Sequence, residues 1–348
     1  MRASVYRGPG DIRVEEVPDA ALSDPADALV RVTHAGVCGS DLWVYRGELE
    51  LYGPPPCRVG HEFLGVVEAV GAEVRTLRPG QRVIAPYTFS DGTCDRCREG
   101  FQTLCPAGGF FGGARDGGQG EAVRVPFADG TLVALPDGSD LSDDRLAAAL
   151  TTLTDVMGTG HHGARVCGAG PGGTVVVVGD GAIGLCAALA ARRLGAERII
   201  VLGHHAPRLA IATAFGATDV VADRGDAAVE RVRELTGGGS AHVIECVGTA
   251  EAFDTAVGSA RADGTVAHLG SPVEPVGLRD AYIRNVRLAG GRAPVRRYIA
   301  ELMDDVLAGR LDPAPVMDLT IPLEEVPAGY AAMHERRAVK VLVRTGAA

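Results

Sequence analysis

The pattern of apolar and polar positions divides the chain into two parts of different character. Residues 1–150 carry short segments of alternating or β-branched apolar residues, such as 27–37, separated by joints rich in glycine and proline. A period of two is typical of strands that bury one face. Helical periodicity begins at 142–166, where Ser142 or Asp143 can cap a helix. The first part is therefore predicted to be mainly β-structure.

From Thr174 onward, strand patterns alternate with helical ones. The predicted strands are 174–178, 198–202, 219–221, 242–246 and 265–270, with helical segments between them. This alternation is typical of a parallel sheet wound in βαβ units. An amphipathic helix is predicted at 295–310, and a last strand at 338–344 can return to the first part.

The order of these elements predicts an α/β protein of two domains. A doubly wound parallel-sheet domain at 155–292 is expected to interrupt a discontinuous β domain, which comprises 1–154 and 293–348. The most apolar stretch, 174–191, reaches membrane-spanning length but is interrupted by glycines at 179 and 181. We interpret it as a buried strand and helix, not as a transmembrane segment.

Composition and charge exclude several classes of function. Hydrophobic residues make up 46% of the chain and charged residues 22%, which is ordinary for a folded protein. A formal net charge of −10 argues against a nucleic-acid surface. The first residues carry no apolar run that resembles a secretory signal, and the eight cysteines are expected to be reduced thiols or metal ligands. We expect a cytoplasmic protein without a membrane or nucleic-acid partner.

The glycine-rich segment VVVVGDGAIG is the clearest motif. Gly179, Gly181 and Gly184 form the spacing G-x-G-x-x-G directly after a predicted strand and at the start of a predicted helix. These glycines permit a tight turn, close approach of a pyrophosphate, and close packing of helix on strand. We therefore predict a dinucleotide site in which Ala182 and Ile183 open the helix beside the phosphates; a turn that serves only packing is the alternative.

The end of the next predicted strand indicates which dinucleotide binds. An acidic residue about 20 positions after the glycines would hold the ribose hydroxyls of NAD. Gly203 stands at this strand end without a carboxylate, and His204, His205 and Arg208 follow it. These side chains can face a 2′-phosphate, so NADP(H) is favoured over NAD(H). Solvent-exposed histidines without a ligand are the alternative.

Candidate metal ligands occur at three separate places before Thr174. Cys38, His61 and Asp155 are side chains of the types that bind zinc, and three protein ligands with one open position define a catalytic zinc site. Singly, each has a structural explanation as a buried residue. Their spacing alone does not bring them together.

Several motifs taken together resemble one known family. VCGSD at 37–41, GHEFLGVVEAVG at 60–71, RPGQRV at 78–83, the cysteine segment at 91–105 and the glycine-rich turn occur in the order found in zinc-dependent medium-chain alcohol dehydrogenases. The resemblance covers essentially the whole chain. It implies a GroES-like β catalytic domain with an inserted Rossmann domain.

The resemblance also implies roles for individual residues. Cys38, His61 and Asp155 are implied as ligands of a catalytic zinc, with Glu62 as an adjacent acid that approaches the metal or pairs with Lys340. Asp41 is implied to orient His61. In the family's mechanism the metal lowers the pKa of a bound alcohol, and hydride passes between its carbinol carbon and the nicotinamide.

The implied proton path departs from that of many relatives. Ser40 is implied to accept and pass on the alcohol proton, but the position three residues later is Trp43, where relatives often have histidine. The proton must then leave through the ribose hydroxyl and water. Trp43 is expected either to line the substrate pocket or to pack in the core. The resemblance further implies cofactor contacts by Thr159 and Val247, and it places His161 and His162 near the nicotinamide as pocket or packing residues.

The segment DGTCDRCREGFQTLC has three cysteines where the family's zinc lobe has four. The family spacing is x₂, x₂ and x₇, which puts Cys94, Cys97 and Cys105 at the last three positions and Asp91 at the first. A carboxylate oxygen is a sound zinc ligand. We therefore predict a structural zinc and two zinc ions per chain; an empty lobe is the alternative.

Three functions follow from these interpretations. The first is an NADP(H)-dependent oxidation of an alcohol or reduction of a carbonyl compound by a zinc enzyme that forms a homodimer or homotetramer. The second is a polyol or sugar dehydrogenase of the same family. The third is a catalytically silent NADPH-binding relative, against which the intact set of Cys38, His61, Asp155 and Ser40 argues.

Overall fold

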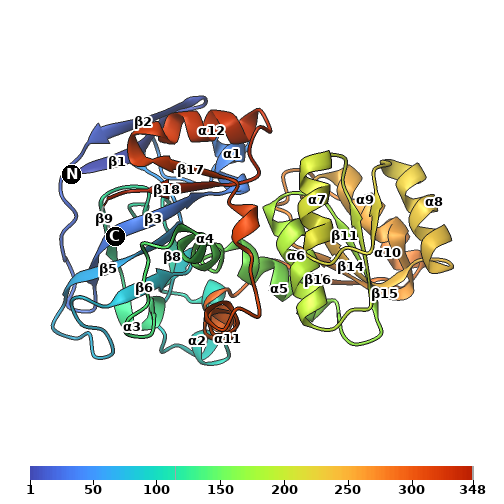
Figure 1. Cartoon of the computed structure of the whole chain (residues 1–348), viewed down its shortest axis with the longest axis horizontal. Coiled ribbons are helices and arrows are strands. Elements are labelled where there is room, and N and C mark those ends of the chain that lie inside the picture. The colour runs from blue at the N-terminus through green and yellow to red at the C-terminus, as the bar shows by residue number, and fades with distance from the viewer. Residues whose placement is uncertain (114, 347–348) are drawn as a thin grey trace. The chain divides into compact units, whose positions relative to one another are not determined.

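The computed structural model describes residues 1–113 and 115–346, and it divides into two compact units. Unit 1 comprises Met1–Gly158 and Pro294–Ala348, and unit 2 comprises Thr159–Ala293. The sequence placed these boundaries after residues 154 and 292. Figure 1 shows unit 1 in blue to green with the red C-terminal elements, and unit 2 in green to orange.

A seven-stranded sheet forms the centre of unit 1 among the described residues. Its strand order is β10-β6-β5-β3-β18-β17, and β9 pairs with β3. The strands are β3 (Ala28–Val37), β5 (Glu62–Val70), β6 (Arg82–Ala85), β9 (Ala122–Val125), β10 (Val133–Ala134), β17 (Leu319–Pro322) and β18 (Val341–Arg344). β18 pairs antiparallel with β3, so the last strand returns to the first domain as predicted.

Smaller elements surround this sheet. The further strands are β1 (Arg2–Gly8), β2 (Asp11–Glu16), β4 (Cys57–Arg58), β7 (Thr88–Phe89) and β8 (Gly109–Phe110). The helices of unit 1 are α1 (Gly39–Tyr45), α2 (Asp95–Arg98), α3 (Ala128–Thr131), α4 (Asp144–Thr152), α11 (Arg296–Leu307) and α12 (Val326–His334), with short 3₁₀ turns η1 (Gln102–Leu104), η2 (Ala314–Val316) and η3 (Leu323–Glu325). Alternating buried residues of the strands, such as Val30, Val32 and Val67, pack into one apolar core.

The helical pattern at 142–166 forms two helices, not one. α4 begins after Asp143, whose carboxylate accepts the backbone N–H of Arg145 at 2.9 Å, and α5 covers Val156–Val166. Threonine hydroxyls at the end of α4 bond to backbone carbonyls, a competition that favours interruption of a helix. Asp155 therefore lies at a break between helices.

Unit 2 contains a six-stranded parallel sheet in the order β13-β12-β11-β14-β15-β16. The strands are β11 (Thr174–Val178), β12 (Arg198–Leu202), β13 (Asp219–Val221), β14 (Ser240–Glu245), β15 (Ala260–His268) and β16 (Arg287–Gly290), and the helices between them are α6 (Ala182–Arg193), α7 (Ala206–Ala214), α8 (Gly225–Thr236), α9 (Ala250–Ser259) and α10 (Arg279–Ile283). The strand order reverses between β11 and β14, which is where ligands bind in doubly wound sheets. The predicted parallel sheet is confirmed.

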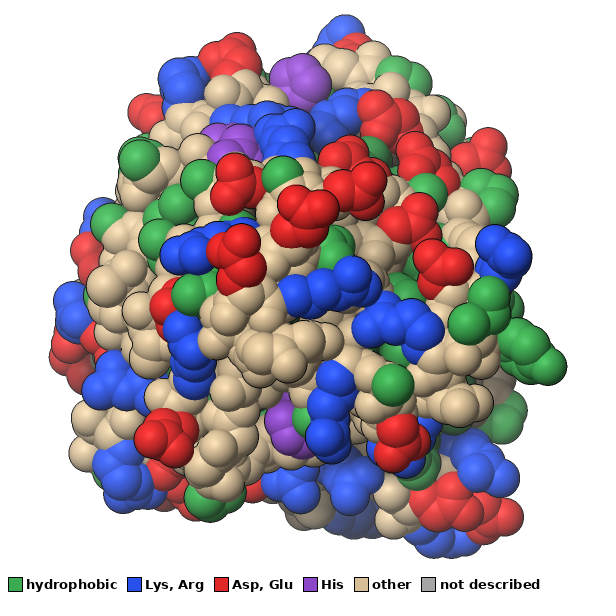
Figure 2. All heavy atoms as spheres, turned by 90° about the vertical axis from the view of Figure 1, so that its right-hand side faces the viewer, with side chains coloured by type: hydrophobic (Ala, Val, Ile, Leu, Met, Phe, Trp, Pro, Cys, Tyr) green, Lys and Arg blue, Asp and Glu red, His purple; other side chains and the backbone are tan. Residues whose placement is uncertain are grey.

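Exposed apolar side chains lie at α10 and on the edge strand β16. Leu278, Tyr282, Ile283 and Leu288 are 56%, 84%, 60% and 45% exposed. Figure 2 shows a face that is otherwise crowded with acidic and basic side chains, with several hydrophobic side chains at its right-hand edge. The expected homo-oligomer stays a prediction. No helix within the described part of the chain is long and apolar enough to cross a bilayer.

The buried His34 makes stability dependent on pH. Burial on β3 lowers the pKa of His34 from 6.5 to about 4, although Asp144 opposes the shift. Because the unfolded chain binds this proton near pH 6.5 and the folded chain does not, stability falls as pH drops below that value. Between pH 7 and pH 5 the loss through this group is about 2 kcal/mol.

His34→Asn should therefore remove about 2 kcal/mol of the pH dependence between pH 7 and pH 5, measured as the free energy of unfolding in urea. His334→Asn, at an exposed histidine of α12, is the matched control and should leave the pH dependence as it is. Identical slopes for the His34 variant and the wild type would contradict the assignment.

Candidate functional site

Four potential metal ligands come together inside unit 1. Ligand atoms of Cys38, His61, Glu62 and Asp155 all lie within 4.8 Å of one another, and all four residues are buried. Cys38 follows β3, His61 precedes β5, and the antiparallel ladder that joins these strands pairs Gly36 with Glu62. The sheet register therefore brings together residues that the sequence alone could not place, and the break after α4 adds Asp155.

The geometry of this cluster fits a cation. Asp155 Oδ2 lies 3.6 Å from Cys38 Sγ and 3.4 Å from His61 Nε2. Among the described residues, both ring nitrogens of His61 are buried without a well-aligned hydrogen-bond partner, although Nδ1 faces Asp41. Burial raises the pKa of the Cys38 thiol, and Glu62 adds to this effect. A bound zinc ion would supply the missing positive charge, because Cys, His and Asp are its usual ligands.

Asp41 lies behind His61. His61 Nδ1 is 3.2 Å from Asp41 Oδ1, and the backbone N–H of Cys38 donates to Asp41 Oδ2 at 2.9 Å. Burial raises the pKa of Asp41, but His61, the hydroxyl of Tyr52 and the backbone N–H of Cys38 together outweigh it, so the net pKa is lowered. Burial likewise opposes protonation of His61, and the carboxylate of Asp41 with Cys38 raises its pKa well above the ordinary value. The arrangement matches the orienting role expected of Asp41.

Glu62 is held by Lys340 of the C-terminal segment. Lys340 Nζ lies 2.8 Å from Oε1 and 2.6 Å from Oε2 of Glu62, and it also donates to the carbonyl of Val37 at 3.1 Å. Both side chains are fully buried. A Cβ at Gly36 would lie 2.0 Å from Glu62 Oε2, so only glycine leaves room for this pair. Of the two roles expected for Glu62, the structure contains the pairing with Lys340.

Ser40 and Trp43 both lie on α1. Ser40 is partly exposed and lies two residues after Cys38. Trp43 is half-buried, and the guanidinium of Arg46 stacks 5.3 Å from the centre of its ring. Trp43 is therefore not a residue of the apolar core.

The cysteine segment forms a second cluster of ligands. One ligand atom each of Asp91, Cys94, Cys97 and Cys105 lies within 4.8 Å of the others, and the three cysteines form no disulfide. Asp91 Oδ1 accepts the backbone N–H groups of Thr93 at 2.7 Å and Cys94 at 2.9 Å. Although burial raises the pKa of Asp91, these donors and the thiols lower it to about 2. The donor set fits zinc.

The glycine-rich turn in unit 2 has the geometry of a dinucleotide cradle. Gly179 has φ +114°, and a Cβ at Gly184 would lie 2.0 Å from the carbonyl oxygen of Gly179. At Gly181, by contrast, a Cβ would meet no atom within 4 Å. Ala182 and Ile183 open α6, so their N–H groups face the space beside the turn. The first and third glycines serve the turn and its packing, while the second leaves room for a ligand.

The residues expected to face the 2′-phosphate surround a carboxylate that the sequence analysis did not consider. Asp180 Oδ2 accepts the backbone N–H groups of His204 and His205 at 3.0 Å each, and His205 Nδ1 lies 2.9 Å from it. Arg208 is 3.7 Å from Asp180 Oδ1. A Cβ at Gly203 would lie 2.4 Å from the Cβ of Asp180, which explains the glycine at this strand end. The carboxylate of Asp180 thus balances part of the positive charge of Arg208.

A further cation, Arg224, lies beside the end of β12. Arg224 precedes α8 and its guanidinium contacts His204 Nε2. Since a guanidinium only donates hydrogen bonds, this contact requires His204 to accept through an unprotonated nitrogen. Arg224 was missed because it follows a different strand, β13, which is a neighbour of β12 only in the folded sheet.

Other predicted cofactor residues have different positions. The side chain of Val247 lies against the turn, 2.8 Å from where a Cβ of Gly179 would be, and its N–H donates to Glu245 Oε1 at 2.6 Å. Thr159, His161 and His162 are buried in α5, and their contacts with a cofactor stay predictions. Glu245 is not among the predicted site residues. It is a buried carboxylate at the end of β14, and its Oε2 lies 2.7 Å from Nδ1 of His268.

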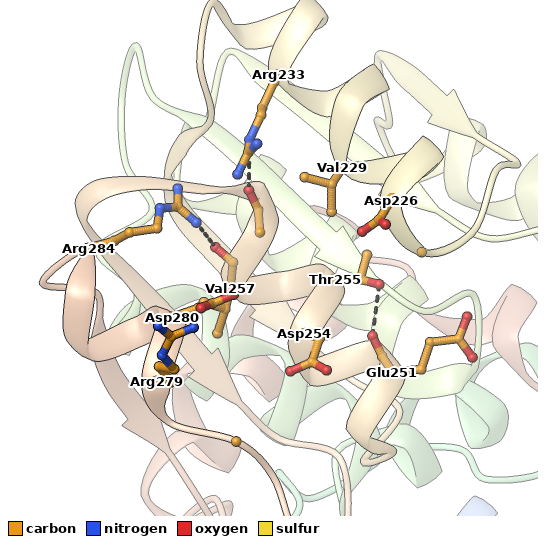
Figure 3. Close-up of a pocket in the computed structure, with 13 residues that line it drawn as sticks. Asp226, Val229, Arg233, Glu251, Asp254, Thr255, Val257, Arg279, Asp280 and Arg284 are labelled. Carbon is orange, nitrogen blue, oxygen red and sulfur yellow. Dashed lines mark hydrogen bonds between the residues drawn. The ribbon is translucent and has the colours of Figure 1, made fainter.

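One hollow of about 810 Å³ lies elsewhere in unit 2, between α8, α9 and α10. Figure 3 shows acidic and basic side chains around it, including Asp226, Asp254 and Arg279. Arg233 and Arg284 turn to carbonyl groups at the end of α9, at 3.2 Å from Gly258 and 2.7 Å from Val257. None of the predicted site residues lines this hollow.

Two family models match the chain. Residues 24–137 match the model of the alcohol dehydrogenase GroES-like domain, and residues 182–307 match that of the zinc-binding dehydrogenase domain. Zinc-type alcohol dehydrogenase B of Aspergillus flavus is 33% identical over 358 residues, which cover 99% of this chain and 82% of that protein.

Two solved structures have the same fold over nearly their whole length. Alcohol dehydrogenase TADH from Thermus sp. ATN1 superposes with a TM-score of 0.89 at 35% identity, covering 99% of both chains. A zinc-binding dehydrogenase from Sinorhizobium meliloti 1021, bound to NADP, superposes with a TM-score of 0.83 at 30% identity, covering 99% of this chain and 98% of that one. The chain belongs to the zinc-dependent medium-chain alcohol dehydrogenases, and the predicted GroES-like and Rossmann domains are confirmed.

The contribution of the buried pair of Glu62 and Lys340 to stability can be tested with a double-mutant cycle. Lys340→Met should lower the free energy of unfolding by about 3–5 kcal/mol, because it leaves a buried carboxylate without its partner. Glu62→Gln in the same chain should restore part of the loss. Arg337→Met, which removes one partner of an exposed pair with Glu335, is the control and should change stability little. Equal effects of Lys340→Met and Arg337→Met on the free energy of unfolding in urea would contradict a stabilising role of the buried pair.

Proposed function

We propose that the protein transfers hydride between NADP(H) and an alcohol/carbonyl pair, either a secondary alcohol and ketone or an aldehyde, with zinc at the Cys38–His61–Asp155 cluster. The observation that carries this proposal is the buried His61 Nε2, which faces a thiol and a carboxylate without a well-aligned partner among the described residues. Zinc bound there would lower the pKa of the substrate hydroxyl, and the nicotinamide would carry the hydride.

The residues of unit 1 have distinct tasks in this function. Cys38, His61 and Asp155 hold the metal, and Asp41 keeps His61 in the tautomer whose Nε2 is free to bind it. Ser40 is partly exposed near Cys38, so its hydroxyl is placed to accept and pass on the substrate proton. Lys340 neutralises Glu62, which limits the negative charge around the metal.

Trp43 changes how that proton leaves. Its indole nitrogen only donates, so it cannot take up a proton at the position where many relatives have histidine. The proton path from Ser40 must then continue through the ribose hydroxyl of the cofactor and water. The half-buried ring of Trp43 is also suited to line the substrate pocket.

We infer a second, structural zinc ion in the cysteine lobe. Asp91, Cys94, Cys97 and Cys105 form a compact set of one carboxylate and three thiols, and two of the sulfurs already accept backbone N–H groups. Such donors stabilise thiolates that bind a metal. The ion would hold the lobe together and take no part in the chemistry.

A preference for NADP(H) is supported by charge and space at the end of β12. Gly203 carries no carboxylate for the ribose hydroxyls, and Arg208 and Arg224 lie nearby. The relative from Sinorhizobium meliloti binds NADP. Asp180 balances His205, so Arg224 is the cation best able to favour a 2′-phosphate.

Two other functions compete with this one. A polyol or sugar dehydrogenase of the same family would use the same metal cluster on a different alcohol, and an NADPH-linked screen over ketones, aldehydes and polyols separates it from the main proposal. A catalytically silent NADPH-binding relative would bind the cofactor without turnover. The complete set of metal ligands argues against this last function.

Metal analysis tests both zinc sites. The wild-type chain should contain two zinc ions, while His61→Ala and Cys97→Ser should each contain one, measured by mass spectrometry of the purified protein. His61→Ala should lose activity with every substrate. A single zinc in the wild type, with Cys94, Cys97 and Cys105 reacting freely with a thiol reagent, would refute the lobe site. Unchanged turnover of His61→Ala would refute the zinc mechanism.

The cofactor preference has its own test. The wild type should have a higher kcat/KM for NADP⁺ than for NAD⁺, and Arg224→Ala should lower the NADP⁺ value about tenfold while leaving that for NAD⁺ unchanged, because a charge-assisted hydrogen bond contributes roughly 1.5–3 kcal/mol. Arg231→Ala, which removes an exposed arginine of α8 paired with Glu234, is the control. A wild-type preference for NAD⁺, or an equal loss with both cofactors, would contradict this assignment.

A further inference from the structure

Asp41 receives more hydrogen bonds than the orientation of His61 requires. Its carboxylate faces the backbone N–H of Cys38, the ring of His61 and the hydroxyl of Tyr52. The side chain is fully buried, so no solvent molecule is at hand to replace a lost donor. Each of these donors therefore contributes to keeping the carboxylate in one orientation.

Tyr52 does not belong to the candidate metal cluster, but its side chain contacts Asp41. It lies in the loop between α1 and β4, outside any helix or strand, and its hydroxyl donates to Asp41 Oδ1. This is the same oxygen that lies 3.2 Å from His61 Nδ1. Loss of the Tyr52 donor would leave that oxygen facing His61 alone.

A second buried tyrosine, Tyr330 of α12, is a neighbour of Tyr52. Tyr330 donates its single proton to Gln119 Oε1 at 3.1 Å, and Gln119 Nε2 donates to the carbonyl of Gly36 at 2.9 Å. A carboxylate only accepts hydrogen bonds, so the single proton of Tyr52 is the one shared with Asp41.

We propose that Tyr52 is a positioning residue for the catalytic metal, which holds the Asp41 carboxylate against His61 Nδ1 and the Cys38 backbone, with Tyr330 and Gln119 behind it. This inference rests on the proposed zinc site. Asp41 contacts two of the metal ligands at once, so a rotation of its carboxylate moves both the imidazole of His61 and the start of α1 at Cys38. Partners of this kind affect metal affinity by about 10–100-fold.

The test is Tyr52→Phe, which removes the hydroxyl and keeps the ring. Its matched control is Tyr6→Phe, because the ring of Tyr6 lies 6.1 Å from that of Tyr52 while its hydroxyl donates to the carbonyl of Val44 and not to Asp41. Zinc affinity is measured by competition with a chromogenic chelator, and the ligand field by the visible spectrum of the cobalt(II)-substituted protein. The contribution of the lobe is removed by subtracting the curve of His61→Ala.

Tyr52→Phe should weaken zinc binding at the cluster by at least about tenfold and change the cobalt spectrum, while Tyr6→Phe leaves both as in the wild type. If Tyr52→Phe does not fold, Tyr330→Phe takes its place with the same expectation relative to Tyr6→Phe. Affinity and spectrum equal to the wild type would overturn the proposal, as would equal losses in the tyrosine variant and its control. A wild-type cluster that binds neither zinc nor cobalt would instead refute the proposed function on which the inference depends.

Discussion

The ion pair of Lys340 with Glu62 inside the sheet of unit 1 is the constraint on which the metal cluster depends. It joins the C-terminal strand region to the start of β5, and both partners are fully buried. Such charges are tolerated in a core only when they are paired with good geometry. The pair therefore ties together β3, β5 and β18, the strands whose register brings Cys38 next to His61.

The remaining polar groups of the cluster depend on one another in the same way. Asp41 and His61 face each other, and each shifts the pKa of the other in the direction that favours the charged form. Asp155 and Cys38 then present a carboxylate and a thiol to the other ring nitrogen. A zinc ion would complete a set of charges that the protein alone leaves incomplete, which is why metal binding and stability are coupled in such sites.

Much of this arrangement could be predicted from the sequence, and the rest could not for physical reasons. Strand and helix patterns in unit 2 were sufficient for the parallel sheet, because fully apolar strands and glycine turns carry strong local signals. The break before Asp155 was missed, since it depends on threonine hydroxyls that compete for backbone carbonyls. Asp180 stands within a recognised motif, but the side chain's direction toward His205 follows from packing against Gly203. Tyr52 has no sequence signal, because its loop has no periodicity.

The division of the chain into two units has a consequence for how the protein can change over time. Every residue of the candidate metal cluster belongs to unit 1, and the glycine turn with Asp180 and Arg224 belongs to unit 2. Substitutions around the glycine turn therefore act on different core packing from substitutions around the cluster. Natural variation, or a protein engineer, can change the surroundings of one candidate site and leave the residues of the other as they are.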